Sequence, residues 1–96
     1  MERVFDLTEE IKTFKLKNKL GLHARSAASI VRVVSQFKSN IHLEHKGQTA
    51  EGDSILDILT LACPFGGLLT IKAEGEDAAA VMEELEKLIE NKFGEN

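Results

Sequence analysis

The segment IKTFKLKNKLGLHARSAASIVRVVSQF, residues 11–37, contains the change of periodicity that decides the fold class. Over residues 11–16 successive side chains alternate between two faces, which predicts a strand with one apolar face. From Ala24 to Phe37 apolar residues recur at steps of three and four, which predicts a helix with one apolar side. Residues 17–21 are expected to form the turn between the two elements. A strand followed by an amphipathic helix indicates a domain of mixed α and β structure.

The rest of the chain is also predicted to form short strands and amphipathic helices. Asp53 or Ser54 is expected to cap a short helix, because such side chains accept hydrogen bonds from the first turn. The predicted order is β-α-β-β-α-β-α, and the class is α+β, with helices on one side of a small, mostly antiparallel sheet. The further elements predicted are strands over 41–44, 48–51 and 68–73, a helix over 55–61 and a helix that follows Asp77.

Size and composition indicate one globular domain. The 96 residues are 43% hydrophobic and 29% charged, enough for a single core. We expect residues 1–10 to be an N-terminal extension and residues 11–96 to form the domain. The longest apolar run, residues 78–82, is far below the ~20 residues that span a bilayer, and no signal peptide is recognisable. The single cysteine, Cys63, fits a reducing compartment, so we expect a cytoplasmic protein without metal or cofactor.

Charge is distributed unevenly along the chain. The net charge of −4 argues against a general nucleic-acid binder, and a chain with five Phe but no Trp or Tyr offers few stacking platforms for RNA. No acidic residue lies between Lys12 and Asn40, whereas acidic residues are dense from Glu74 onward. One interpretation is two oppositely charged faces that aid solubility. The other is a basic surface that meets an acidic partner protein.

His23 is the main candidate for chemistry, because it lies just before the predicted helix of residues 24–37. A helix N-terminus offers unpaired N–H groups and a positive end, which together bind phosphate. The same positive end disfavours a cationic imidazole and leaves a neutral ring nitrogen as a nucleophile. Arg25 is in reach of the same anion, and Gly21 is expected to leave the approach open. The alternative is a surface histidine near a helix end. His42 and His45 lack partners at metal-ligand spacing.

The segment Gly21-Leu22-His23-Ala24-Arg25, followed by Ser26-Ala27-Ala28, resembles the active-site segment of the HPr family. These proteins are the histidine-containing phosphocarriers of the bacterial phosphotransferase system. The resemblance extends over residues 11 to 92 and implies the HPr fold, an open-faced β-sandwich. The other matching segments are residues 43–47, 53–56, 59–62 and 69–71, together with Gly66, Gly75 and the closing helix.

The resemblance implies a role for individual residues. His23 would accept a phosphoryl group from phospho-enzyme I and pass it to a histidine of a sugar-specific IIA domain, with no turnover of its own. Arg25 would balance the charge of the phosphate. Leu22, Leu56 and Leu59 match positions at which the family exposes apolar side chains for docking. For the two residues of the short helix, the alternative is a place in the core.

Ser54 matches a serine that HPr kinase/phosphorylase modifies in some bacteria, and an N-cap role would also explain a serine here. A phosphate at this helix start would be stabilised locally and would weaken binding to an acidic partner. The chain departs from the family at three positions. Ser26 stands where proline is usual, and Asp53 and Asp57 stand where residues are often basic or small. The extra negative charge beside Ser54 would disfavour the kinase or an acidic enzyme I.

Two alternatives to the sugar phosphocarrier remain open from the sequence. The chain could be a regulatory relative within the family that serves nitrogen or catabolite control. It could instead be a small α+β binding module that is never phosphorylated. A stand-alone enzyme is disfavoured, because one histidine and one arginine do not supply a substrate pocket. Substitution of His23 separates the binding module from the carrier, since only the carrier depends on the imidazole.

Overall fold

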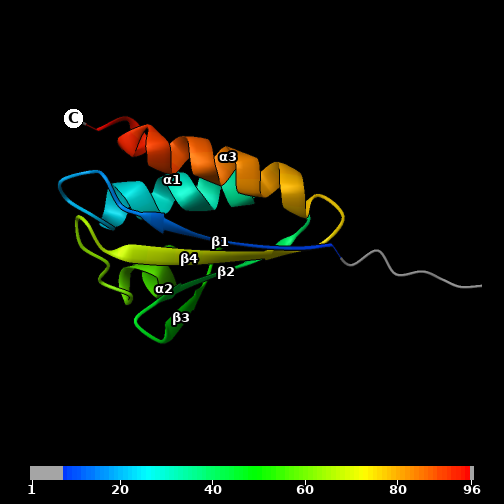
Figure 1. The fold of residues 1–96 in the computed structure, drawn as a ribbon, viewed down its shortest axis with the longest axis horizontal. Coiled ribbons are helices and arrows are strands. Elements are labelled where there is room, and N and C mark those ends of the chain that lie inside the picture. The colour runs from blue at the N-terminus through cyan, green and yellow to red at the C-terminus, as the bar shows by residue number, and fades with distance from the viewer. Residues whose placement is uncertain (1–7, 96) are drawn as a thin grey trace, which may run out of the picture.

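A computed structural model describes residues 8–95 of the chain. The strands form one antiparallel sheet in the order β1-β4-β2-β3, drawn in Figure 1. The predicted element order and the α+β class are confirmed. No helix among the described residues is both long and apolar enough to cross a membrane. The elements are β1 (Glu9–Lys15), α1 (Ala24–Val34), β2 (Asn40–His45), β3 (Gln48–Glu51), α2 (Ile55–Leu59), β4 (Leu68–Glu74), α3 (Ala78–Glu90) and a 3₁₀ turn, η1 (Lys92–Gly94).

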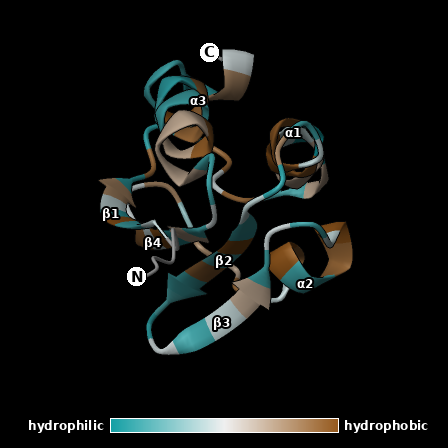
Figure 2. Ribbon diagram, turned by 90° about the vertical axis from the view of Figure 1, so that its right-hand side faces the viewer, coloured by the Kyte–Doolittle hydropathy of each residue, from teal (hydrophilic) through white to brown (hydrophobic). Residues whose placement is uncertain are grey.

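The molecule has two layers, and one face of the sheet stays open. Helices α1 and α3 lie side by side over the other face, while α2 packs against α1 and β3 at one side (Figures 1 and 2). Alternation along β4 shows the division, because Leu69 and Ile71 are fully buried whereas Thr70 and Lys72 are only partly covered. This is the open-faced sandwich that the resemblance implied.

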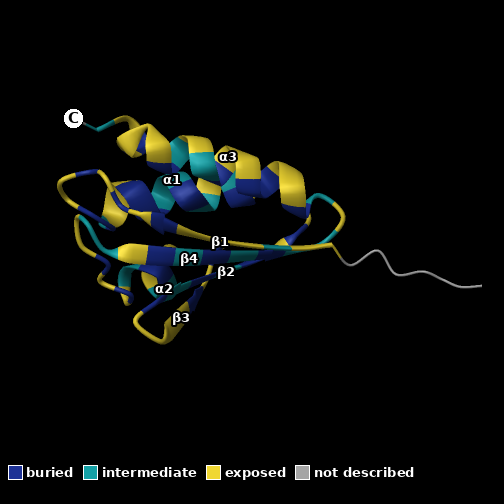
Figure 3. Ribbon diagram, in the orientation of Figure 1, coloured by how far each residue is buried: buried dark blue, intermediate teal, exposed yellow. Residues whose placement is uncertain are grey.

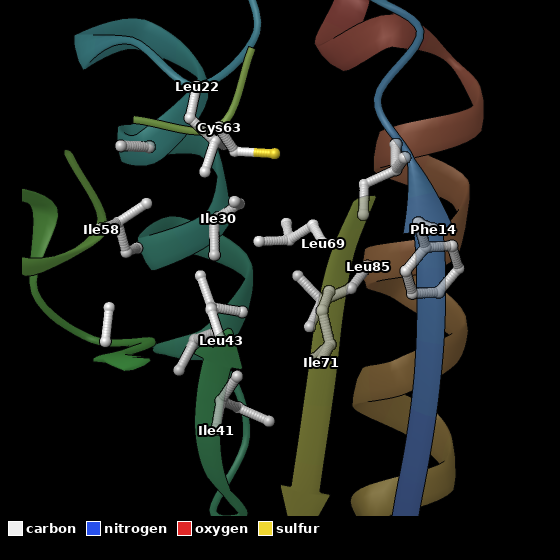
Figure 4. Packing of buried hydrophobic residues seen from close by; sticks show 14 of the residues in the cluster. Phe14, Leu22, Ile30, Ile41, Leu43, Ile58, Cys63, Leu69, Ile71 and Leu85 are labelled. Atoms are coloured by element: carbon white, nitrogen blue, oxygen red, sulfur yellow. The ribbon is translucent and has the colours of Figure 1, made fainter. Parts of the chain in front are cut away.

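The core lies between the sheet and the two long helices. Burial of its apolar side chains is the main favourable contribution to folding. On α3 the side chains of Val81, Met82 and Leu85 are buried, and the glutamates of the opposite side face solvent (Figure 3). Figure 4 shows Ile30 of α1 and Leu69 of β4 meeting in this layer. The periodicities read from the sequence therefore mark the buried faces.

Two helix boundaries differ from the prediction. Helix α1 ends at Val34, although apolar spacing continues to the half-buried Phe37. The N–H of Gln36 bonds to the carbonyl of Val33, three residues earlier, at 3.0 Å, so the chain tightens into a turn that keeps the spacing. Helix α2 ends at Leu59 for the same reason, because the next residues also make bonds of three-residue span.

Strand β1 begins at Glu9, two residues before the predicted start, because Glu9 and Glu10 continue the pairing with β4. Residues 1–7, which make up most of the expected N-terminal extension, lie outside the described part of the chain. Ser54 caps α2, since its Oγ accepts a hydrogen bond from the N–H of Asp57 at 3.1 Å. This selects Ser54 over Asp53 as the cap.

The loop that precedes α1 is fixed to the segment after α2. Gly21 has a φ of +64°, and a Cβ built there would lie 2.5 Å from the carbonyl oxygen of Cys63 and 2.8 Å from the Cα of Pro64. The N–H of Leu22 donates to the same carbonyl at 2.9 Å. Glycine is therefore needed for backbone conformation and close packing. The expectation that Gly21 clears the approach to His23 is wrong, because the missing side chain would face away into Cys63 and Pro64.

Candidate functional site

His23 occupies the N-cap of α1, with extended backbone angles of φ −138° and ψ −177°. Its backbone N–H donates to the Oγ of Ser26 at 2.9 Å, and that hydroxyl lies 3.0 Å from the carbonyl oxygen of Gly21. The His23 side chain faces the backbone N–H of Ser26 in the arrangement of a capping box. A proline at position 26 would provide neither this hydroxyl nor this N–H. Ser26 therefore fixes the histidine at the start of the helix.

A shallow hollow opens to solvent around the imidazole. No acidic residue lies in the first turn of α1, so the positive end of the helix is not compensated within that turn. Lys19 and Arg25 add two exposed cationic side chains to this rim. The hollow therefore combines a ring nitrogen, two cations and a helix N-terminus, which suits a phosphoryl group. Its lining residues are Lys19, Leu20, His23, Ala24, Arg25, Gly94 and Glu95.

Glu95 contacts the histidine from the far end of the chain. Its Oε2 lies 2.6 Å from Nε2 of His23, and its Oε1 accepts a hydrogen bond from Nδ2 of Asn18 at 3.0 Å. The same amide nitrogen of Asn18, a fully buried residue, also donates to the carbonyl oxygen of Gly21 at 2.7 Å. Sequence reasoning missed both residues. Asn18 stood in a predicted turn, and nothing in the sequence connects residue 95 with residue 23.

The charge of Glu95 is favoured by its partners. Burial by itself raises the pKa of this carboxyl group. Hydrogen bonds from Asn18 and His23 and the attraction of Arg25 outweigh that effect, so the pKa lies below its ordinary value. Only 12% of the Glu95 side chain and 27% of the His23 side chain are exposed. Near neutral pH the histidine therefore faces a carboxylate that is largely shielded from water.

The expected docking residues lie in different environments. Leu56 of α2 is 78% exposed, whereas Leu59 is half-buried and packs against the core. Leu22 is only 8% exposed and points into the core beside Cys63 (Figure 4). The expectation that Leu22 exposes its side chain is wrong, because the bond to Cys63 turns this residue inward. Leu20, which sequence reasoning did not single out, is 68% exposed at the rim of the hollow.

Ser54 lies at the N-terminus of α2, on a different helix from His23. It is half-buried, and its Oγ is engaged by the N–H of Asp57. The carboxylate of Asp57 in turn accepts a hydrogen bond from the backbone N–H of Glu51 at 2.6 Å. The hydroxyl is thus part of a small network that also holds negative charge.

The other two histidines make ordinary structural contacts. Nε2 of His42 lies 3.2 Å from a carboxylate oxygen of Glu51 on the neighbouring strand. His45 is buried, and its Nδ1 lies 2.8 Å from the carbonyl oxygen of Leu68. Within residues 8–95 no group of three His, Cys, Asp or Glu side chains is placed to hold a metal ion. His23 is therefore the histidine around which phosphate-binding features gather.

Comparison with known proteins adds an independent line of evidence. A family model described as the PTS HPr component phosphorylation site matches residues 11–91. The phosphocarrier protein HPr of Xylella fastidiosa is 40% identical over 79 residues, which cover 82% of this chain and 89% of that protein. The multiphosphoryl transfer protein of Haemophilus influenzae is 38% identical over 89 residues, 90% of this chain but 18% of that longer protein.

Among solved structures, a crystal structure of HPr from Thermoanaerobacter tengcongensis superposes with a TM-score of 0.86. The two sequences are 39% identical, and the match covers 91% of this chain and 98% of the other. The fold, the match to the family model and these relatives all point to the same family. The chain belongs to the HPr family of phosphotransferase-system proteins.

Proposed function

We propose that this chain carries phosphoryl groups in the sugar phosphotransferase system, with His23 as the residue that accepts and donates them. The observation that carries the proposal is the partly exposed imidazole at the N-terminus of α1, beside Arg25 in a solvent-open hollow. The names of its relatives, phosphocarrier protein and multiphosphoryl transfer protein, support the same activity.

The geometry explains how transfer would proceed. A ring nitrogen of His23 attacks the phosphorus of a phosphohistidine on the donor protein, and the bond between phosphorus and the donor nitrogen breaks. Arg25 and the first N–H groups of α1 neutralise the three phosphoryl oxygens as they pass between the partners. The N–P bond formed on His23 is labile, so the same group can be passed on. No cofactor is required, because each partner supplies one imidazole.

We propose phospho-enzyme I as the donor and sugar-specific IIA domains as acceptors. The rim of the hollow presents the cations Lys19 and Arg25 and the exposed Leu20, and Leu56 is exposed on the neighbouring helix α2. Exposed apolar side chains combined with cations suit acidic protein partners. Such a donor and a free thiol at Cys63 both fit the cytoplasm. Leu59 is half-buried against the core, so it exposes only part of its side chain to this surface.

Ser54 remains a proposed site of regulatory phosphorylation by HPr kinase/phosphorylase. Its place at the N-terminus of α2 would stabilise a phosphate locally. Modification would also esterify the Oγ that now accepts a hydrogen bond from the N–H of Asp57, and it would add negative charge next to the Asp57 carboxylate. Incubation with such a kinase and ATP, followed by mass spectrometry of wild type and Ser54→Ala, tests the assignment. Phosphate on a different residue, or none, would refute it.

The carrier role is tested by intact-mass measurement after incubation with phosphoenolpyruvate and bacterial enzyme I, before and after mild acid. We expect one acid-labile phosphoryl group on the wild type and none on His23→Ala. His42→Ala is the matched control, because His42 lies on the sheet and away from the hollow. A phosphoryl group that persists in His23→Ala, or a wild type that enzyme I from the same organism leaves unmodified, contradicts the proposal.

A further inference from the structure

We propose that the chain has a second contact site for its phosphoryl donor, in a hollow whose most exposed side chain is Phe65. The hollow lies at the start of β4, and His45, Lys46, Phe65 and Leu68 are among its lining residues; we call it the Phe65 hollow. This inference rests on the proposed function and adds to it a part of the surface that recognises phospho-enzyme I. Exposed apolar area, a buried hydrogen-bond acceptor, a free cation and contact with the histidine loop support it.

Two large apolar side chains of the Phe65 hollow face solvent. Phe65 is 60% exposed and Leu68 is 58% exposed. Aromatic side chains are enriched among the residues that carry most of the binding energy at protein interfaces. They bury a large area and have only two side-chain torsions to immobilise. The pair therefore offers an apolar anchor that the fold of the chain itself leaves uncovered.

A tight turn presents the Phe65 ring. The N–H of Gly67 bonds to the carbonyl of Pro64 at 2.9 Å, and Gly66 has a φ of +81°, which is typical of the third residue of a type II turn. The turn is also fixed from outside, because the N–H of Gly66 bonds to the carbonyl of Leu16 at 2.9 Å. A partner that covers the ring therefore has little backbone to immobilise, and binding is less costly for that reason.

His45 supplies a hydrogen-bond acceptor to the same hollow. Its side chain belongs to a residue that is only 8% exposed, and its Nδ1 lies 2.8 Å from the carbonyl oxygen of Leu68. A carbonyl only accepts, so Nδ1 carries a hydrogen and Nε2 of the neutral ring is an acceptor. Within residues 8–95, the side-chain polar atom that is fully buried without a partner is Oδ1 of Asn18. Nε2 of His45 therefore reaches solvent, where a donor on a partner protein can bond to it.

Lys46 adds a cation at the rim. It is exposed at the tip of the hairpin between β2 and β3, and it pairs with no carboxylate of the described residues, whereas Lys12 and Lys72 do pair. The acidic residue of the hollow, Glu44, accepts a hydrogen bond from the N–H of Gly47 at 2.9 Å. The ammonium group of Lys46 is thus available to a carboxylate of an acidic partner.

The Phe65 hollow adjoins the loop that carries His23. Pro64, which lines the hollow, lies so close to Gly21 that a Cβ built on this glycine would be 2.8 Å from the Cα of Pro64. Leu20, the next residue back along the chain, lies at the rim of the hollow around His23. In Figure 1 the loops of residues 16–23 and 60–67 lie at the same end of the molecule, where α1 begins. A donor protein docked over His23 can therefore cover both hollows at once.

A second copy of this chain and a protein outside phosphoryl transfer are the other possible occupants of the Phe65 hollow. The donor is favoured because the hollow continues the surface around His23 and because its free cation repeats the charge of Lys19 and Arg25. Only occupation by the donor makes the KM for transfer from phospho-enzyme I depend on Phe65.

The experiment measures the initial rate of phosphorylation by phosphoenolpyruvate and catalytic enzyme I, followed as pyruvate release, over a range of protein concentrations. The variants are Phe65→Ser and Lys46→Glu. Ile11→Ser is the matched control for the first, because Ile11 is 57% exposed and lines neither hollow. Lys38→Glu is the control for the second, since Lys38 is exposed beyond the C-terminal end of α1. The melting temperature of each variant is measured alongside.

We expect KM to rise by about tenfold in Phe65→Ser, the scale of one lost aromatic anchor, and by a few-fold in Lys46→Glu. The kcat should stay that of wild type, because the contact is remote from the phosphorus atom and is present before and during transfer. Both controls should keep the wild-type KM. The KM of Lys46→Glu should also depend less on salt than that of wild type, since one attractive charge has been reversed.

An unchanged KM in Phe65→Ser, or an equal rise in Ile11→Ser, would overturn the second contact site. A lowered kcat at constant KM would overturn it as well. If Phe65→Ser melts at a clearly lower temperature, the KM of Lys46→Glu decides, because that change lies at an exposed hairpin tip. A wild type that acquires no phosphoryl group contradicts the proposed function itself. A phosphorylated wild type whose KM depends on neither Phe65 nor Lys46 contradicts only the second contact site.

Discussion

Replacing Gly21 by alanine should destabilise the whole protein, although the change adds a single methyl group. Two costs add. The φ of +64° is left-handed, which costs a residue with a Cβ about 1–2 kcal/mol. The new Cβ would also lie 2.5–2.9 Å from backbone atoms of Cys63 and Pro64, and relieving such overpacking costs about 1–3 kcal/mol. We therefore expect a loss of about 2–5 kcal/mol in the free energy of unfolding.

Gly47→Ala is the matched control. Gly47 has a φ of +83°, but nothing lies within 4 Å of a Cβ built there. It should therefore lose only the conformational part, about 1–2 kcal/mol. Urea unfolding of wild type and both variants, followed by circular dichroism, gives the three free energies. Equal losses in Gly21→Ala and Gly47→Ala would refute the argument that close packing at Cys63 and Pro64 holds the loop before His23.

Three further predictions follow from other parts of the molecule. The pKa of Asp77 is lowered, first by the hydroxyl of Ser39 and then by the N–H of Lys38. The stabilisation by the Asp77 carboxylate is therefore complete above its ordinary pKa and is lost as the pH falls through the lower pKa of the folded state. In urea unfolding at a series of pH values, Asp77→Asn should lose less stability than wild type as the pH falls. Leu56→Ser should leave the melting temperature within a few degrees of wild type but raise the enzyme I KM several-fold, because this leucine is 78% exposed; an unchanged KM would remove it from the docking surface. Leu85→Ala, at a fully buried site, should cost about 2–5 kcal/mol in the free energy of unfolding by urea, and a loss under 1 kcal/mol would contradict its place in the core.

Periodicity made most of the fold predictable, because burial of one face leaves a direct record in the sequence. The stripe of α3 and the alternation of β4 both appear there as spacings of apolar residues. Ends of helices leave a weaker record. The apolar spacing up to Phe37 is compatible with a tight turn as well as with a helix. The last residue of α1 could therefore not be predicted from the spacing alone.

The site was predictable only where it is local in sequence. His23 and Arg25 are two residues apart, at the N-cap and in the first turn of a helix that the apolar spacing predicted. Leu22 was expected at the surface because it matches a position at which the family exposes an apolar side chain, yet it is buried, and its N–H bonds to the carbonyl of Cys63. Glu95 reaches the same site from 72 residues away, and only the packing of α3 over the sheet brings it there.

The sheet order has a consequence for how the chain is made. β1 lies at the edge of the sheet and pairs only with β4 among the described strands, with Glu9 opposite Glu74. A ribosome adding about 5–20 residues per second needs roughly 3–13 s to synthesise the 65 residues that separate these two positions. Throughout that interval β1 lacks the strand with which it pairs, and the loop that carries His23 lacks the later segments that hold it in place. A nascent chain stalled before Leu68 should therefore be cut readily by protease, whereas a released, complete chain should resist it.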